Sequence, residues 1–185
     1  MKDLITKKMF AVHLTGHGEI DKLKYLPNVA IPIPQDDEVL INVKAAGINN
    51  TDINTRIGWY SKSEQGNNND GSWSGNPLDF PIIQGADICG IIVAVGSSID
   101  ENRIGERVIV RTMQEVPLNQ KNYSSWTVGS ECNGGFAQYS AIRSSEAFAV
   151  NSNWTDAELG SIPCAYSTAE GLLHRSKLKD EISVL

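Results

Sequence analysis

The sequence predicts a mainly β domain with a few helices, whose short strands form a barrel or a sandwich. Runs rich in β-branched residues recur between turn-forming residues, at 10–14, 38–45, 88–95, 107–111, 135–142 and 147–150. Within the run 38–45, Val39, Ile41 and Val43 fall on one side of an extended chain. This alternation indicates a strand with one buried face and one face in water.

Helical patterns are confined to two regions of the chain. A short helix is predicted over 51–57, and Thr155 followed by Glu158 forms a capping box that begins a helical turn. A longer helix is predicted from about 163 to 176. Between the first strands and these last helices, residues 61–76 are almost all polar or turn-forming, which predicts a long surface loop. A lid over a site and a tolerated insertion both fit such a loop.

Composition excludes several classes of protein. The chain has 185 residues, with 16 Lys+Arg against 22 Asp+Glu and a net charge of −6, which argues against nucleic-acid binding through phosphate contacts. No apolar run approaches the about 18 residues that a membrane span needs. Cys89, Cys132 and Cys164 are too few and too scattered for a disulfide framework. We therefore expect a cytoplasmic protein that binds neither nucleic acid nor membrane.

The C-terminal residues predict that the chain is the front part of a longer protein. After the helix, a short polar turn leads into residues 182–185 (ISVL), which are apolar except for Ser183 and are typical of the start of a strand. Helix, turn and strand in this order are typical of the entry into a doubly wound α/β domain.

Five short segments, in order, resemble the medium-chain dehydrogenase/reductase superfamily, and specifically its N-terminal GroES-like catalytic domain. They are 46–52 (AGINNTD), 85–96 (GADICGIIVAVG), 104–110 (IGERVIV), 134–139 (GGFAQY) and 162–169 (IPCAYSTA). The resemblance implies a partly open GroES-like β-barrel over 1–160. It also implies that 161–185 form a connecting helix and the first strand of a truncated Rossmann cofactor domain.

The same resemblance implies a nicotinamide cofactor, NADPH or NADH, bound mostly by the domain that would follow. The chain has no Gly-x-Gly-x-x-Gly motif; Gly16 and Gly18 lack the third glycine, so we expect a turn there. Zinc-dependent relatives bind metal where this chain has Asn49 and Ala86, which are not zinc ligands. Cys164 and Asp87 match two further positions of that motif and cannot form a tetrahedral site alone, so no zinc is expected.

The resemblance also identifies three candidate site residues. Asn49 matches an asparagine of zinc-free quinone oxidoreductases that faces cofactor and substrate, while Asn50 or Thr51 would cap the helix. Tyr60 matches a tyrosine whose hydroxyl points into the pocket and could stabilise charge on a substrate oxygen; it could equally anchor a loop. Thr168 matches a threonine that contacts the nicotinamide, and helix packing is its alternative role.

Cys164 has two interpretations, because a helix start favours a thiolate whereas free cysteine usually packs as a small apolar residue. Cys89 is predicted to be buried, and Cys132 to lie in an exposed loop. His13, His17 and His174 are isolated in the sequence and suggest no ligand set.

The predicted function is hydride transfer from NADPH or NADH to a small carbonyl compound, a quinone or an α,β-unsaturated ketone or aldehyde, without zinc. A zinc-dependent alcohol dehydrogenase and a non-catalytic GroES-like binding module are the alternatives. We expect a homo-oligomer, dimer or tetramer, for the full-length protein. The chain alone should lack activity and should self-associate through an exposed apolar surface.

Overall fold

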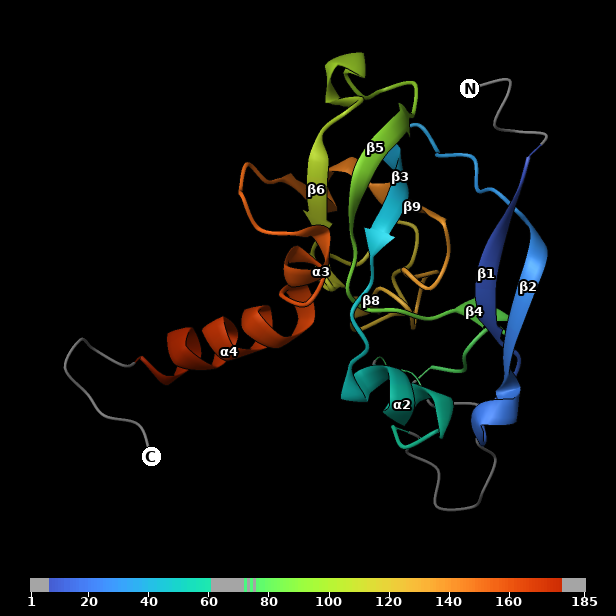
Figure 1. The fold of residues 1–185 in the computed structure, drawn as a ribbon. Helices are drawn as coiled ribbons and strands as arrows, with labels where there is room; N and C mark the ends of the chain where they lie inside the picture. The colour runs from blue at the N-terminus through green and yellow to red at the C-terminus, as the bar shows by residue number, and fades with distance from the viewer. Residues whose placement is uncertain (1–6, 61–71, 73, 75, 178–185) are drawn as a thin grey trace.

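The computed structural model describes residues 7–60, 72, 74 and 76–177. The predicted loop over 61–76 therefore lies outside the described residues except for three of them, and the predicted strand over 182–185 lies outside them entirely. Within the described residues, the chain forms a mainly β domain from which one helix projects (Figure 1).

Antiparallel pairing joins the strands into sheets. The five-stranded sheet has the order β10-β6-β5-β3-β9, and the three-stranded sheet has the order β2-β1-β4. The strands are β1 (Lys8–Leu14), β2 (Leu23–Ala30), β3 (Glu38–Ala45), β4 (Ile82–Ile83), β5 (Cys89–Val95), β6 (Arg107–Val110), β7 (Met113–Gln114), β8 (Trp126–Thr127), β9 (Tyr139–Arg143) and β10 (Ala147–Ala149). β7 and β8 form a separate pair.

The helices are short except for the last. They are α2 (Asn50–Arg56), α3 (Asp156–Leu159) and α4 (Pro163–Ser176), with 3-10 turns η1 (Ile20–Lys22), η2 (Glu101–Arg103) and η3 (Ser144–Glu146). The predicted helix over 163–176 is confirmed, as is the Thr155 capping box, in which Thr155 Oγ1 accepts from Glu158 N at 3.2 Å. The turn predicted at Gly16 to Gly18 is also present, and it joins β1 to η1.

The two larger sheets are linked by the residues that precede β9. Val12 N donates to Phe136 O at 2.8 Å, and Gln138 N donates to Phe10 O at 3.1 Å, so this stretch runs beside β1 before it pairs with β3. The predicted strand over 135–142 consequently begins as a strand only at Tyr139. This junction converts two sheets into a partly closed barrel.

The apolar side chains of β3 enter two cores. Val39 and Ile41 are fully buried in one, with Ile88, Val108 and Val110. Leu40, on the opposite side of the strand, is 2% exposed in the other core, with Met9 and Ile83. The expectation that one face of this strand lies in water is therefore wrong at Leu40, where the barrel supplies a second core, whereas Lys44 on the same face is exposed.

The predicted strand list omits β2 as well as the two-residue strands. β2 has the sequence LKYLPNVA, which lacks alternation and contains a proline, and most of its residues are exposed. An edge strand tolerates a proline because one side of its backbone needs no partner. β2 is a strand because it pairs with β1, and its own residue pattern does not predict this.

α4 leaves the barrel and packs against it only at its first turn (Figure 1). Pro163 is its one buried residue, and Tyr166, Leu172 and Leu173 are 66%, 67% and 49% exposed. Pro163 at the first helical position is a local signal for the start of α4. Lys177, in the left-handed conformation, marks its end. In the part of the chain that is described, no helix is long and apolar enough to cross a membrane.

Candidate functional site

The candidate site begins where β3 passes into α2. Asn49 is the N-cap residue of α2 and forms a capping box with Asp52, whose Oδ2 accepts from Asn49 N at 2.8 Å. The prediction that Asn50 or Thr51 caps the helix is wrong. Asn49, which matches the site asparagine of the family, is therefore also the residue that caps α2.

Asp52 fastens the first turn of α2 to the segment before β5. Its side chain is buried, and its Oδ1 accepts from Gly85 N at 3.1 Å and from Ala86 N at 3.3 Å. Burial raises the pKa of the Asp52 carboxyl, while the backbone N–H donors act in the opposite direction and the nearby charge of Asp87 raises it further. Gly85 and Ala86 lie 33 and 34 residues after Asp52, so no local sequence pattern predicts these contacts.

Asp87 connects α2 to α4. Asn49 Nδ2 donates to Asp87 Oδ2 at 2.9 Å, and Cys164 N, in the first turn of α4, donates to Asp87 Oδ1 at 2.6 Å. Burial raises the pKa of Asp87, and these two donors oppose the shift. A single carboxylate that is 1% exposed thus joins three segments far apart in the sequence.

Gly47 makes this close approach possible. A Cβ built at this position would lie 2.6 Å from Asp87 Oδ2 and 2.7 Å from the carbonyl oxygen of Gly160 at the end of α3. Real Cβ atoms essentially never come this close to another heavy atom. The backbone of the 46–49 segment therefore lies directly against Asp87 and α3, which only glycine permits.

Tyr60 folds back along α2 toward its first turn. Tyr60 Oη donates to Thr51 Oγ1 at 3.3 Å and accepts from Asn54 Nδ2 at 3.4 Å. Trp59 lies edge-on to its ring, with the ring centroids 5.4 Å apart. The hydroxyl of Tyr60 is thus near the end of α2 that Asn49 caps.

The path of the chain into Tyr60 is fixed by the end of α2. Gly58 adopts φ +73° and donates to Thr55 O at 3.2 Å, and Trp59 N donates to Asn54 O at 2.9 Å, which is the Schellman arrangement. His17 Nδ1 lies 2.9 Å from Thr55 O, so this nitrogen carries the hydrogen. Gly18 N donates to Arg56 O at 2.9 Å, and the turn between β1 and η1 therefore covers the last carbonyls of the helix.

Thr168 lies on an exposed part of α4, and its Oγ1 donates to Cys164 O one turn earlier at 2.7 Å. Its connection to Asn49 runs through α4 and Asp87. Thr168 lies beyond the part of α4 that packs on the barrel, so the described residues give it no packing role. Its nicotinamide contact stays a prediction.

The three cysteines are poor candidates for thiolates. Burial, together with the charges of Asp87 and Asp52, raises the pKa of Cys164 to about 11, which disfavours the thiolate interpretation. Cys89 is fully buried, as predicted. Cys132 is half-buried rather than exposed, and burial raises its pKa to about 12.

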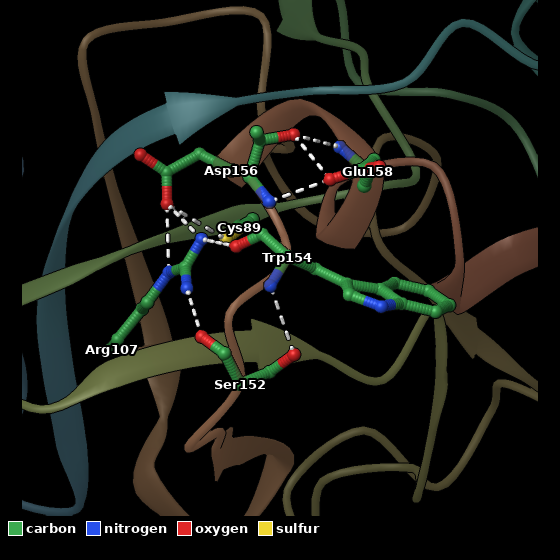
Figure 2. Close-up of polar contacts among 7 residues, drawn as sticks. Cys89, Arg107, Ser152, Trp154, Asp156 and Glu158 are labelled. Carbon is green, nitrogen blue, oxygen red and sulfur yellow. Dashed lines mark hydrogen bonds and ion pairs between the residues drawn. The ribbon is translucent and has the colours of Figure 1, made fainter.

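A second polar cluster fastens α3 to the barrel (Figure 2). Arg107 on β6 contacts Asp156 Oδ1 through Nε at 2.8 Å and through Nη2 at 2.7 Å, and it donates to Ser152 O and Trp154 O. Cys89 Sγ donates to the same Asp156 oxygen at 3.8 Å. The sequence analysis missed this cluster, because only the sheet brings β6 to the linker before α3.

The residues in the place of a catalytic zinc site do not fit the metal. The Asn49 amide and the Asp87 carboxylate hydrogen-bond to each other, and the Ala86 side chain has no atom that can coordinate a metal, which leaves the Cys164 thiol alone. Tetrahedral zinc sites need thiolate, imidazole or carboxylate ligands that are free to coordinate. Across the described ranges, no three His, Cys, Asp or Glu side chains gather in a metal-binding group.

These features define a GroES-like barrel whose polar site lies at the start of α2 and α4. The family model of the alcohol dehydrogenase GroES-like domain matches residues 35–152. The chain therefore belongs to this family, the N-terminal catalytic domain of the medium-chain dehydrogenase/reductase superfamily, and the predicted fold class is confirmed.

Several relatives in sequence are named as reductases or oxidoreductases. A 2-methylene-furan-3-one reductase of Solanum lycopersicum is 29% identical over 169 residues, which cover 91% of this chain and 38% of the relative. A quinone oxidoreductase of Homo sapiens is 29% identical over 180 residues, which cover 97% and 45%. A crystal structure of a Sinorhizobium meliloti protein, described as an alcohol dehydrogenase, has a TM-score of 0.81 and 38% identity, and covers 96% of this chain and 49% of that one. The chain spans less than half the length of these proteins.

Proposed function

We propose that this domain belongs to a zinc-independent reductase that transfers hydride from NADPH or NADH to a quinone or to an α,β-unsaturated ketone or aldehyde. The observation that carries the proposal is the replacement of a metal site by hydrogen bonds. Asn49, Asp87 and the backbone of Cys164 satisfy one another at the positions where zinc-dependent relatives hold metal. The relatives named as reductases of a furanone and of quinones support the same substrate class.

The chain's own residues would supply binding and orientation. The nicotinamide cofactor supplies the hydride when it is bound. Asn49 keeps a second amide N–H beyond the one that Asp87 accepts, and Tyr60 brings to the same end of α2 a hydroxyl whose hydrogen would turn from Thr51 Oγ1 to the substrate oxygen. Donors of this kind stabilise a carbonyl oxygen on which negative charge develops.

Thr168 would lie along the nicotinamide from α4, whose start Asp87 holds. The chain lacks the glycine-rich turn that binds a dinucleotide pyrophosphate, so its residues fit only the nicotinamide end of the cofactor. The remainder of the cofactor needs a second domain, which agrees with the share of the relatives' length that this chain covers.

The first test is to read the coding frame beyond Leu185 and then to assay the complete polypeptide. We expect a Gly-x-Gly-x-x-Gly or a close variant within about a dozen residues, the distance that a strand-to-helix phosphate turn requires. The complete protein should oxidise NADPH or NADH with 1,4-naphthoquinone or an enone. It should not reduce NAD⁺ or NADP⁺ with a simple alcohol.

Tyr60→Phe is the matched variant, because it removes one hydroxyl and keeps the ring. Loss of an oxyanion donor typically lowers kcat about 100-fold or more. An unchanged kcat would remove Tyr60 from the site. A stop codon directly after Leu185, or zinc-dependent oxidation of alcohols, would overturn the proposed function and favour a binding module or an alcohol dehydrogenase respectively.

We also propose that the complete protein is a homo-oligomer and that this chain alone self-associates. The support is the exposed apolar surface of α4, which includes Tyr166, Leu172 and Leu173. Exposed apolar patches of this kind favour association. Sedimentation of the chain at tens of micromolar checks this expectation, and a single monomeric species would contradict it.

A further inference from the structure

Both oxygens of the Asp87 carboxylate accept hydrogen bonds, and both donors are N–H groups. Oδ2 accepts from the Asn49 amide, and Oδ1 accepts from Cys164 N. The side chain is 1% exposed, so no solvent substitutes for either partner. A carboxylate in this position can only accept, and it therefore dictates which groups of its neighbours face it.

This acceptor sets the polarity of the Asn49 amide. The two ends of an asparagine amide have nearly the same shape, and only their hydrogen-bond partners distinguish them. Asp87 requires the NH₂ end. The oxygen end consequently faces the first turn of α2, where Asn49 forms its capping box with Asp52.

The same carboxylate also caps α4. The residue before Pro163 is Ile162, which has no side-chain hydrogen bond to offer the free N–H groups of the first turn. Asp87 accepts from Cys164 N instead, although it lies 77 residues earlier in the chain. A negative charge at this end is also favoured by the helix dipole.

We propose that Asp87 is a positioning residue of the site: it fixes the Asn49 amide with its NH₂ end toward Asp87 and its oxygen toward the first turn of α2, and it holds the first turn of α4 at the same point. Asn49 then has one remaining N–H to donate to an acceptor atom of a ligand, such as a carbonyl oxygen. This ligand contact rests on the proposed function. The polarity of the amide does not, and it is tested separately.

The test exchanges the two side chains. In Asp87→Asn, the new amide oxygen must accept the hydrogen bond from Cys164 N. The NH₂ group of the new side chain would then face the NH₂ group of Asn49. In Asn49→Asp, two carboxylates would face each other. In the double variant Asn49→Asp with Asp87→Asn, the amide at 87 donates to the carboxylate at 49, and every donor regains an acceptor.

We expect each single variant to lower the folding equilibrium constant about tenfold or more, since each leaves a buried polar group unsatisfied. The double variant should recover most of that loss in urea unfolding of the 185-residue chain. Asp21→Asn serves as the control for removal of a carboxylate, because the Asp21 side chain is 66% exposed and its carboxylate lies 3.7 Å from Lys22 Nζ. Its stability should match that of the wild type.

Nitrogen-15 NMR supplies a readout that a general loss of packing would not reproduce. The Asn49 NH₂ pair should be resolved and slow to exchange in the wild type, and it should lose that protection in Asp87→Asn. If Asp87→Asn fails to fold, a folded double variant supports the proposal.

A double variant as unstable as the sum of the two single variants would overturn it, as would an unaltered Asn49 signal in Asp87→Asn. None of these readouts depends on enzymatic activity. Failure of quinone reduction would therefore overturn the proposed function without affecting this result.

Discussion

Removal of the Arg107 guanidinium should release the linker that leads from β10 into α3. In Figure 2, Arg107 reaches two carbonyl oxygens of that linker, those of Ser152 and Trp154, and the carboxylate of Asp156 at the start of α3. The carbonyl contacts measure 3.1 Å and 2.7 Å. These oxygens would lose a charged donor in Arg107→Ala.

The expected destabilisation follows from these contacts. A hydrogen bond to a charged group contributes about 1.5 to 3 kcal/mol, with wide variation. The pair with Asp156 adds less than about 1 kcal/mol, since the carboxylate is 42% exposed and water screens it. Both carbonyl oxygens regain partial hydration when the linker opens, so we expect Arg107→Ala to cost about 3 kcal/mol in total. Arg107→Lys keeps the charge but loses the fork geometry, and about half of that cost should remain.

Urea unfolding of the chain measures the free-energy change, and the alkylation of Cys89 locates it. Cys89 lies under Asp156, and burial raises the pKa of its thiol, so it should react with iodoacetamide only when the linker opens. Arg107→Ala should therefore accelerate its modification. Arg175→Ala, in the exposed last turn of α4, is the control and should change neither quantity. A loss below about 0.5 kcal/mol with an unchanged alkylation rate would refute this account of the cluster.

Further predictions concern the site and its surroundings. Gly47→Ala should destabilise the chain by about 2 kcal/mol because its Cβ would meet Asp87 and the Gly160 carbonyl, whereas Gly16→Ala, with open space around it, should be nearly neutral in the same urea unfolding assay. Gly58→Ala should cost about 1 kcal/mol, since φ +73° strains any residue with a Cβ and the His17 ring lies against that position; an unchanged unfolding midpoint would show that the end of α2 can rearrange. The Cys164 thiol, with a pKa of about 11, should be protonated at neutral pH, and its alkylation rate should rise about tenfold per pH unit up to that value, as measured in a Cys132→Ser background; a plateau near pH 8 would contradict the burial argument. Elemental analysis of the purified chain should find less than about 0.1 zinc per molecule, and one zinc per chain would overturn the reading of Asn49 and Ala86.

Local patterns predicted the elements whose signals lie within a few residues. The strand over 38–45 and the helix over 163–176 match the structure in their bounds, because alternation, Pro163 and the end of the apolar pattern are all local. β2 was missed because its pairing depends on β1 and its own residues do not alternate. The burial of Leu40 was also missed, since only the closure of the barrel places a second core on that side.

The site residues were predicted by resemblance, and their contacts were not. Asn49 and Asp87 are 38 residues apart, and Asp87 and Cys164 are 77 apart, so no local pattern connects them. Asp87 drew attention only as the match to a family glutamate. Its role as the cap of α4 depends on the fold, which brings the start of β5 against the first turn of that helix.

Two roles were considered for residues at the start of α2, capping of the helix and lining of the site. Asn49 has the first role, and the second is proposed for the same side chain. Asn49 begins the helix, bonds to Asp87 and still keeps an amide N–H. A metal holds its ligands by charge and tolerates several donor types, whereas a hydrogen-bonded chain of amide, carboxylate and backbone N–H works only when each donor faces an acceptor. Replacement of nitrogen by oxygen at nearly constant side-chain size should therefore disturb this site, and the single and double variants at positions 49 and 87 measure that effect directly.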